Sequence, residues 1–238
     1  SSGIAVLDAN GDKKPDLAVA SYKAGLTMYI HRPGGTFAPS APYPGYFSDV
    51  LVADFDGNGR ADVAGLQGHD NMVRIFRTLP DGSLTNAPVL PVYGGPTVTG
   101  DWNGDGWTDI AVLDQSNATN VLLNDKKGHF GNPTAISSLS IVGSLATADF
   151  DGDGNSDLLV GAADMMNQAS LRLSVGRGDG SFQPPQLLWT GRTYTRPIVA
   201  DVNGDKRPDI LFRDAMQNIL LLRNAGGVFA APVTLPVG

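Results

Sequence analysis

The sequence predicts an all-β fold built from five copies of one unit, and three observations support this prediction. An Asp-rich loop of nine residues recurs five times, and the first aspartates of successive loops lie 46, 47, 48 and 52 residues apart. The apolar runs between these loops are too short for helices and are flanked by turn residues, as expected for strands. All 24 acidic residues are Asp, a residue of turns, and none is the helix former Glu.

Four strands are expected in each repeat, and the first of them leads directly into the Asp-rich loop. Small residues near the end of this strand suit a crowded position where several strands converge on an axis. The first strands are expected at residues 4–7, 50–53, 98–100, 145–148 and 198–200. Second strands follow the loop, as at residues 17–20, 110–113 and 158–160. Third strands are expected at residues 26–30, 72–76, 121–123, 171–175 and 219–222.

The fourth strand of each repeat is expected beyond a glycine turn that carries an apolar residue, as in Gly128, His129 and Phe130. The segments that follow contain proline, which belongs on edge strands, so the fourth strand forms the outer rim. Four strands at this repeat length are typical of a β-propeller blade. The predicted fold is therefore a single β-propeller domain, residues 1–238, of five four-stranded antiparallel blades. Its repeats are expected at about residues 1–46, 47–94, 95–141, 142–193 and 194–238.

The Asp-rich loops have the pattern of a calcium site. Oxygen-bearing side chains occupy positions 1, 3, 5 and 9, and glycine occupies position 4, where the main chain needs a positive φ to turn around an ion. Calcium takes six to eight oxygen ligands in flexible geometry, whereas magnesium demands a tighter octahedron. Position 7 is expected to supply its main-chain carbonyl. The predicted ligands are Asp8, Asn10, Asp12, Lys14 and Asp16; Asp54, Asp56, Asn58, Arg60 and Asp62; Asp101, Asn103, Asp105, Trp107 and Asp109; Asp149, Asp151, Asp153, Asn155 and Asp157; and Asp201, Asn203, Asp205, Arg207 and Asp209.

Two alternatives fit this pattern less well. An EF-hand needs a bidentate Glu at position 12 of its loop. The five loops have instead Val19, Gly65, Val112, Val160 and Phe212. The fourth side-chain ligand of each site is therefore assigned to the carboxylate of the Asp at position 9. Ordinary metal-free turns also use Asp, Asn and Gly, but they give no reason for five copies in one register.

We expect up to five calcium ions, one for each loop. The loop that begins at Asp149 should bind most tightly because it alone supplies four carboxylates, and binding should be weaker where Lys13 and Lys206 replace glycine at position 6. Five ions would change the formal charge from −7 to +3, so the acidity reflects metal binding rather than a preference for basic partners. Extracellular calcium loops often have dissociation constants of about 10⁻⁴ to 10⁻³ M, which predicts an extracellular or secreted protein.

The rest of the composition excludes several classes of protein. Basic residues are scattered without runs or interleaved aromatic residues, so nucleic-acid binding is not expected. Without cysteine, neither disulfides nor thiolate metal sites can form. No apolar run is long enough to span a bilayer, so membrane insertion is not expected, and any export signal was removed or lies outside this sequence.

The Asp-rich loop, the apolar strand after it and the later Gly-x-Phe turn resemble the FG-GAP or VCBS repeats of integrin α-subunit heads, propeller lectins and some extracellular polysaccharide lyases. The resemblance covers essentially the whole chain. It implies that each loop joins the first and second strands of a blade on the lower face, and that calcium binds there. Rings in that family usually have seven or eight blades. The five repeats therefore form either a five-bladed ring or part of a larger one.

The opposite, upper face of the blades is the expected surface for a ligand, because loops on a rigid scaffold gather binding residues. The segments expected on this face are residues 21–23, 69–71, 114–117, 164–167 and 213–214, with those around Tyr46 and Tyr93 and residues 189–196. A role of Trp189 in capping a blade is the alternative to a role in binding. The residues proposed for ligand contact have flat rings or planar donors that suit sugars and acidic groups, and they are Trp189, Arg192, Tyr194 and Arg196.

A non-catalytic binding module, lectin-like or adhesive, is the predicted function, with carbohydrate or an extracellular protein as ligand. Acid–base catalysis needs a carboxylate pair or a His with a perturbed pKa in a cleft, and the eight Asp residues outside the loops show no paired pattern. The alternative is the propeller domain of an extracellular polysaccharide lyase or hydrolase. Whether the chain acts alone, as a homo-oligomer or within a larger chain stays open.

Overall fold

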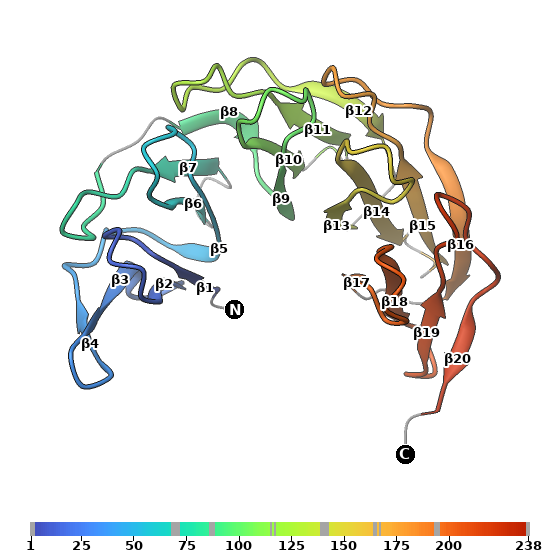
Figure 1. Cartoon of the computed structure of the whole chain (residues 1–238), viewed down its shortest axis with the longest axis horizontal. Helices are drawn as coiled ribbons and strands as arrows, with labels where there is room; N and C mark the ends of the chain where they lie inside the picture. Colours follow the sequence, from blue (N-terminus) through green and yellow to red (C-terminus); the bar gives the residue numbers. More distant parts are fainter. Residues whose placement is uncertain are drawn as a thin grey trace. The chain divides into compact units, whose positions relative to one another are not determined.

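The structure is a computed structural model and describes residues 3–67, 72–85, 89–114, 116, 118–138, 143–163, 166, 168–192 and 196–236. These residues form five four-stranded sheets and no helix (Figure 1). In every sheet the strands follow one another in chain order, and successive strands run antiparallel. The predicted all-β fold with four-stranded antiparallel blades of the propeller type is confirmed.

Each blade takes four consecutive strands. Blade 1 contains β1 (Ile4–Leu7), β2 (Asp16–Ser21), β3 (Gly25–Arg32) and β4 (Thr36–Pro39). Blade 2 contains β5 (Phe47–Ala53), β6 (Asp62–Gln67), β7 (Met72–Phe76) and β8 (Val89–Tyr93). Blade 3 contains β9 (Thr97–Gly100), β10 (Asp109–Leu113), β11 (Ala118–Leu122) and β12 (Thr134–Ser138). Blade 4 contains β13 (Gly143–Ala148), β14 (Asp157–Ala163), β15 (Gln168–Ser174) and β16 (Gln186–Arg192). Blade 5 contains β17 (Ile198–Ala200), β18 (Asp209–Arg213), β19 (Ile219–Leu222) and β20 (Val233–Leu235).

The strands occur in the predicted order, and β1, β7, β17 and β19 have the predicted ends. The main difference concerns Trp189, which lies inside the outer strand β16 rather than in a loop between blades. Trp189 pairs with Leu171 of β15, next to a register shift between Leu171 and Arg172. The extra residue at such a bulge lengthens the edge strand, and the spacing of the repeats alone did not indicate this.

The chain divides into two compact units. The first comprises Ser1–Gly95, Trp107–Asp109 and Leu122–Pro133, and it holds blades 1 and 2. The second comprises Pro96–Gly106, Ile110–Val121 and Thr134–Gly238, and it holds blades 4 and 5 with most of blade 3.

The core of the first unit lies between the sheets of blades 1 and 2. Ala18 of β2 and Met28 of β3 are cross-strand partners, and both are fully buried. They belong to one apolar cluster with Phe47, Val63 and Phe76 of blade 2. Because successive side chains of a strand point to opposite faces, alternate positions can supply a face that packs on the next blade. Burying each large apolar side chain contributes about 1.5–3 kcal/mol relative to leaving it exposed.

Blades 4 and 5 pack on each other in the same way within the second unit. Leu159 and Leu173 of blade 4 form a cluster with Ile210 and Leu222 of blade 5. Within every blade, the Asp-rich loop joins the first and second strands at one end, and the turn between the second and third strands lies at the other end. The candidate metal sites in the Asp-rich loops therefore lie one strand length away from the candidate ligand-binding loops at the other end of each blade.

Candidate functional site

The carboxylate at position 1 of each Asp-rich loop is held by the main chain of that loop. In the fourth loop, the N–H of Gly154 donates to Asp149 Oδ2 at 2.9 Å, and the N–H of Gly152 donates to Oδ1 at 2.7 Å. The N–H at position 6 donates to the position-1 carboxylate over 2.8–2.9 Å in all five loops. The repeated sequence therefore gives one repeated loop conformation, in which the first predicted ligand is already fixed.

Left-handed main-chain conformations make these loops possible. The glycines at position 4 have φ between 67 and 83°, as the sequence predicts. Position 6 is also left-handed in every loop, and there Lys13 and Lys206 take φ of 62 and 68°. A residue with a Cβ pays roughly 1–2 kcal/mol in this region, so the first and fifth loops reach the shared conformation at greater strain.

The aspartates at position 9 are fully buried, and they have a role that the sequence did not reveal. Asp157 accepts the N–H of Phe150 in its own loop at 2.8 Å and the N–H of Gly176 after β15 at 2.8 Å. Asp62 likewise accepts from Phe55 at 3.2 Å and from Thr78 at 2.9 Å. Asp16 and Asp209 each accept one N–H from position 2 of their own loop and one from the end of the third strand. Position 9 therefore ties the loop to the end of the third strand, in addition to its predicted role as a ligand.

Two loops bring three carboxylates close together. Asp54, Asp56 and Asp62 each offer an oxygen within 4.8 Å of the others, and Asp149, Asp151 and Asp153 do the same. Burial, with the charge of Asp56 adding to it, raises the pKa of Asp62 to about 6. Burial also raises the pKa of Asp157 to about 6. In both cases the two N–H donors offset only part of the cost of burying the charge, and a bound cation would stabilise the ionised carboxylate further.

The first, third and fifth loops have Asn at position 3, so fewer charges meet there. Asn103 Nδ2 donates to Asp105 Oδ2 at 3.1 Å, and Asn203 Nδ2 donates to Asp205 Oδ2 at 3.0 Å. The N–H of Lys206 is the main cause that lowers the pKa of Asp201. Amide oxygens can also ligate calcium, so these loops keep a full set of donors with less mutual repulsion.

Trp107 at position 7 of the third loop packs on the second loop, as its outward-facing side chain should. The six-membered ring of Trp107 lies over Gly57, where an added Cβ would stand 2.2 Å from Cη2 of Trp107. Any larger residue at position 57 would displace this ring. Gly57 is therefore needed both for the positive φ of the second loop and for the contact with Trp107 of the third loop.

A second set of contacts fastens the second, third and fourth loops to the following blade. The ring of Phe150 in the fourth loop meets Phe229 of the fifth Gly-x-Phe turn at a centroid distance of 5.9 Å. Trp102 meets Phe182, and Phe55 meets Phe130, in equivalent places. The aromatic residue at position 2 of these three loops and the Gly-x-Phe turn of the next blade therefore form one contact.

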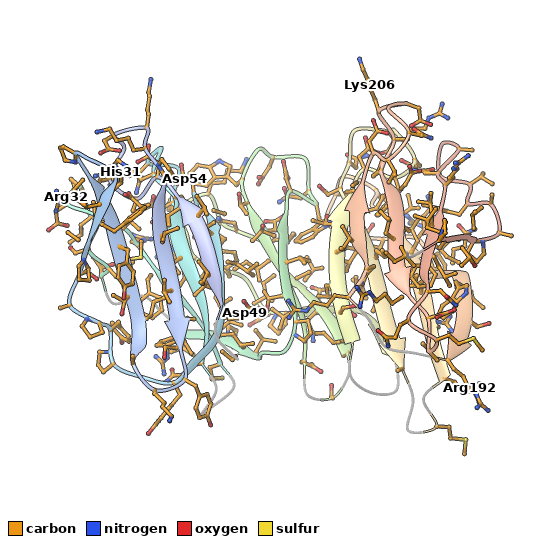
Figure 2. All side chains as sticks on the ribbon, turned by 90° about the horizontal axis from the view of Figure 1, so that it is seen from below. His31, Arg32, Asp49, Asp54, Arg192 and Lys206 are labelled. Atoms are coloured by element: carbon orange, nitrogen blue, oxygen red, sulfur yellow. The ribbon has the colours of Figure 1, made fainter. Side chains whose placement is uncertain are left out.

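The residues proposed for ligand contact occupy several environments. The ring of Trp189 packs on Phe212 at a centroid distance of 4.8 Å and is half-buried, as a blade-capping residue would be. Arg192 is exposed and lies at the end of the strands away from Lys206 of the fifth Asp-rich loop (Figure 2). Tyr194 lies outside the described residues.

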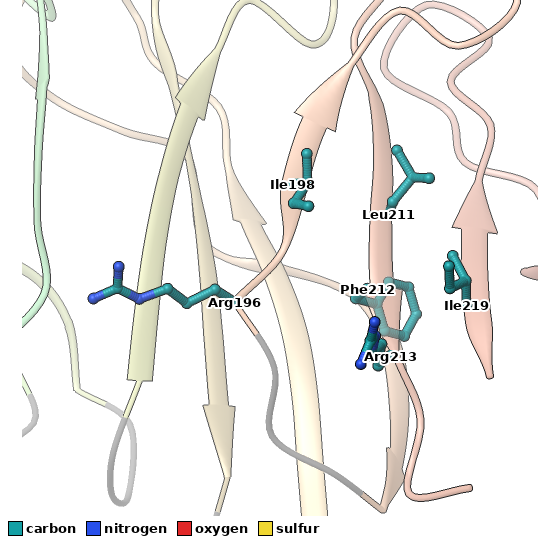
Figure 3. Close-up of a pocket in the computed structure, with 6 residues that line it drawn as sticks. All are labelled: Arg196, Ile198, Leu211, Phe212, Arg213 and Ile219. Carbon is teal, nitrogen blue, oxygen red and sulfur yellow. The ribbon is translucent and has the colours of Figure 1, made fainter. Parts of the chain in front are cut away.

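Arg196 lines a pocket of about 410 Å³ on blade 5. Figure 3 shows its side chain extending from the chain just before β17, with Phe212 and Ile219 on the adjoining strands. Ile198 at the rim is 65% exposed. The structure thus places Arg196 in a pocket that is otherwise lined mainly by apolar side chains, among them Phe212, on which the ring of Trp189 packs.

The described residues contain no helix that is long and apolar enough to cross a membrane.

Comparison with known proteins places the chain among repeat proteins. The profile of the FG-GAP-like repeat family matches residues 8–65, 101–160 and 149–212. T-cell immunomodulatory proteins of Mus musculus and Homo sapiens are each 30% identical to the chain over 126 residues. This match covers 50% of the chain and 20% of each relative, so the chain spans a fraction of the length of these proteins.

Two solved structures share the fold. BBS1N, solved in complex with ARL6DN, matches with a TM-score of 0.62 and 11% identity, over 98% of this chain and 68% of that one. The Photorhabdus luminescens Tc holotoxin pore matches with a TM-score of 0.54 and 20% identity, over 99% of this chain and 12% of that one. All five Asp-rich loops lie inside the three segments that match the family profile, and these segments cover more than half of the chain. The chain belongs to the FG-GAP-like repeat family.

Proposed function

We propose that this chain is a calcium-stabilised extracellular binding module. In this proposal the five Asp-rich loops hold calcium, and the opposite ends of the blades contact a carbohydrate or protein ligand. The observation that carries the calcium part is the shared loop geometry, in which the main chain fixes the position-1 carboxylate in the same way five times. The close carboxylates of the second and fourth loops support it as well.

Calcium is the cation that suits this donor set. The donors are carboxylate and amide oxygens without nitrogen or sulfur, which favours a hard cation over zinc or copper. Loops of this kind in extracellular proteins bind calcium with dissociation constants of about 10⁻⁴ to 10⁻³ M, and such sites fill only outside the cytosol. An extracellular or secreted location follows from the proposal.

A binding role is favoured over polysaccharide lysis or hydrolysis by the aspartates outside the loops. Asp81 accepts from the hydroxyl and the N–H of Ser83, and these bonds lower its pKa. Asp179 does the same with Ser181. The side-chain amide of Asn218 is the main cause that lowers the pKa of Asp214. A general acid needs a raised pKa, so these carboxylates fit turn capping better than catalysis.

The experiment that tests the ligand part is a glycan array, run beside an assay for cleaved saccharide. We expect binding in millimolar calcium without release of product. An Arg192→Ala and Arg196→Ala double variant should bind less if this end of blades 4 and 5 takes part, since both side chains are exposed. Trp189→Ala is less informative because it removes a ring that packs on Phe212. Arg32→Ala, at the end where the Asp-rich loop of blade 1 lies, is the control for lost charge.

Cleaved product from the wild-type protein would contradict the non-catalytic part of the proposal. Calcium-independent glycan binding by a protein that stays folded in excess chelator would contradict the calcium part.

A further inference from the structure

We propose that a pocket on blade 1 binds an acidic saccharide, an inference that rests on the proposed binding function and gives it a site. The pocket has a volume of about 350 Å³, which is in the range of sites for small ligands. It lies between the β2–β3 turn and the connection from β4 to β5, at the end of blade 1 away from the loop of residues 8–16. It is lined by residues that include Lys23, Gly25, Pro42, Pro44, Gly45 and Tyr46.

Tyr46 gives the pocket an aromatic wall, and the exposed ring of Tyr22 lies beside it. The rings of Tyr22 and Tyr46 have centroids 5.3 Å apart and planes at 46° to each other. Tyr22 is 54% exposed and Tyr46 is 46% exposed, so much of each ring faces solvent. Rigid aromatic rings offer a large contact area for little loss of side-chain entropy, and their polar tips can form hydrogen bonds. Such a wall suits the flat face of a sugar ring.

The connection that carries Tyr46 is held to β3 by main-chain hydrogen bonds at Ser40 and Tyr43. The N–H of Leu26 donates to Tyr43 O at 3.0 Å, and the N–H of Tyr43 donates to Leu26 O at 2.8 Å. The N–H of Ser40 donates to Met28 O at 2.8 Å. The ring of Tyr43 packs on Phe76 at a centroid distance of 4.6 Å. Because the pocket is held in place before a ligand arrives, binding loses little free energy to ordering of the protein.

Two glycines let the walls of the pocket come together. Gly25 has φ of 84°, and an added Cβ would stand 2.2 Å from Tyr43 O. Gly45 has φ of 143°, and an added Cβ would meet the Phe47 ring at 3.0 Å. The hydroxyl of Ser21 accepts the N–H groups of Lys23 and Ala24, at 3.3 and 3.1 Å, and so closes the turn that presents Lys23. Ser21 and Gly25 therefore fix the conformation of the turn that carries Lys23.

The charge of the pocket selects an acidic ligand. Lys23 is the ionisable cation in the lining, and within the described part of the chain it forms no salt bridge. A carboxylate on a bound sugar can therefore pair with its ammonium group while the sugar ring lies against Tyr46. Neutral sugars keep the ring contact and lose the ion pair, so they should bind more weakly.

The test is an NMR titration of the calcium-loaded chain with methyl β-glucuronide and with methyl β-glucoside, which differ in the carboxylate at C6. We expect the glucuronide to bind at least threefold more tightly. Tyr22→Ala and Tyr46→Ala should each weaken binding of both sugars by at least threefold. Lys23→Gln should bring the glucuronide to the affinity of the glucoside. Lys127→Gln, an exposed lysine in another turn, is the matched control and should change neither affinity.

Thermal melting of each variant checks that it is folded, and Tyr22 and Lys23 are exposed enough to replace without harm to the core. Equal affinities of the wild type for the two sugars, or a preference that survives in Lys23→Gln, would overturn the assignment. Binding that survives both Tyr variants but is lost in Arg192→Ala would also overturn it, yet would leave the proposed binding function in place. A wild type that binds a proline-rich peptide in this pocket and neither sugar would overturn the saccharide assignment alone. Failure of the wild type to bind any glycan or protein would contradict the proposed function itself.

Discussion

The side-chain amide of Asn224 donates a hydrogen bond of 2.7 Å to the carbonyl oxygen of Phe150, which is 74 residues away in the loop of the preceding blade. The same amide donates to Pro208 O at 3.1 Å, and the side chain is 3% exposed. In the first unit, Asn124 donates to Phe55 O at 2.8 Å. A buried asparagine therefore fastens the Asp-rich loop of one blade to the blade that follows it.

Replacing Asn224 by Ala should lower the free energy of unfolding by about 1–3 kcal/mol, because the buried carbonyl of Phe150 and the half-buried carbonyl of Pro208 would lose their donor. Denaturant unfolding of the calcium-loaded protein measures this loss. Asn218→Ala is the control, since its amide caps a turn at Asp214 with more solvent around it. A loss no greater than that of the control would contradict the account of this contact.

Replacing Lys13 or Lys206 by Gly should stabilise the protein by roughly 0.5–1 kcal/mol, because glycine adopts positive φ without the steric penalty of a Cβ but loses more chain entropy on folding. Thermal unfolding of each variant measures the gain. Lys14→Gly is a matched control, since Lys14 is not among the residues with positive φ. A destabilisation by Lys13→Gly as large as that by Lys14→Gly would show that the left-handed conformation is not a source of strain.

Calcium affinity should fall as the pH drops below about 6. The pKa values of Asp62 and Asp157 are both raised to about 6 by burial, and calcium binds the ionised carboxylates. At pH 5 about a tenth of each group would be ionised, so the affinity of these two loops should be roughly tenfold weaker than at full ionisation. Isothermal titration calorimetry at pH 5 and pH 7 makes this comparison.

The metal-free protein should show the opposite trend in stability. Because the folded pKa of both groups lies above the unfolded value near 3.8, the folded state holds more protons between these values. The contribution of these groups is therefore fully present below about pH 4 and is lost as the pH rises through about 6. The assigned pKa shifts would be contradicted if these two carboxylates made the unfolding free energy of the metal-free protein rise between pH 4 and pH 6.

The repeated loop carried most of what the sequence could predict. Five loops in register indicated the blades, the order of strands and the left-handed glycines at position 4, because each of these depends on local residues. The hydrogen bond between Asn224 and Phe150 was not predictable in this way, since it joins residues in different repeats. The position of Asn224 is also not constant, because Thr78 and Gly176 stand there in blades 2 and 4. The double role of the position-9 aspartates was missed for the same reason.

The candidate ligand face was harder to predict than the loops. The chemistry of Trp189 favours a role in ligand contact, but Trp189 lies inside β16, next to a bulge in that strand, and its ring packs on Phe212. Tyr22 and Tyr46 come from segments that the sequence placed on the ligand face, yet their proximity depends on the bridge between Leu26 and Tyr43. Local sequence patterns indicated which segments form irregular loops. Which side chains of those loops are exposed depends on tertiary contacts, which the patterns do not contain.

Removal of calcium should lower the melting temperature of the chain. Three or four carboxylates within one loop repel one another once the ion leaves, and a ligand that binds only the folded state contributes about 2.7 kcal/mol at a hundredfold excess over its Kd for each site. Melting curves in millimolar calcium and in excess chelator measure the change. Magnesium at the same concentration is the control for ionic strength and should restore less of the loss.

The number of calcium ions bound per chain tests the central claim most directly. Equilibrium dialysis of the purified protein against millimolar calcium, with the calcium content of the dialysis buffer subtracted from that of the protein compartment, should give up to five bound ions per chain. Asp149→Asn should lower the count by one, because Oδ1 and Oδ2 of Asp149 are both held in place as acceptors at the head of the fourth loop. Fewer than three ions per chain would contradict the interpretation of the five loops as one repeated calcium site.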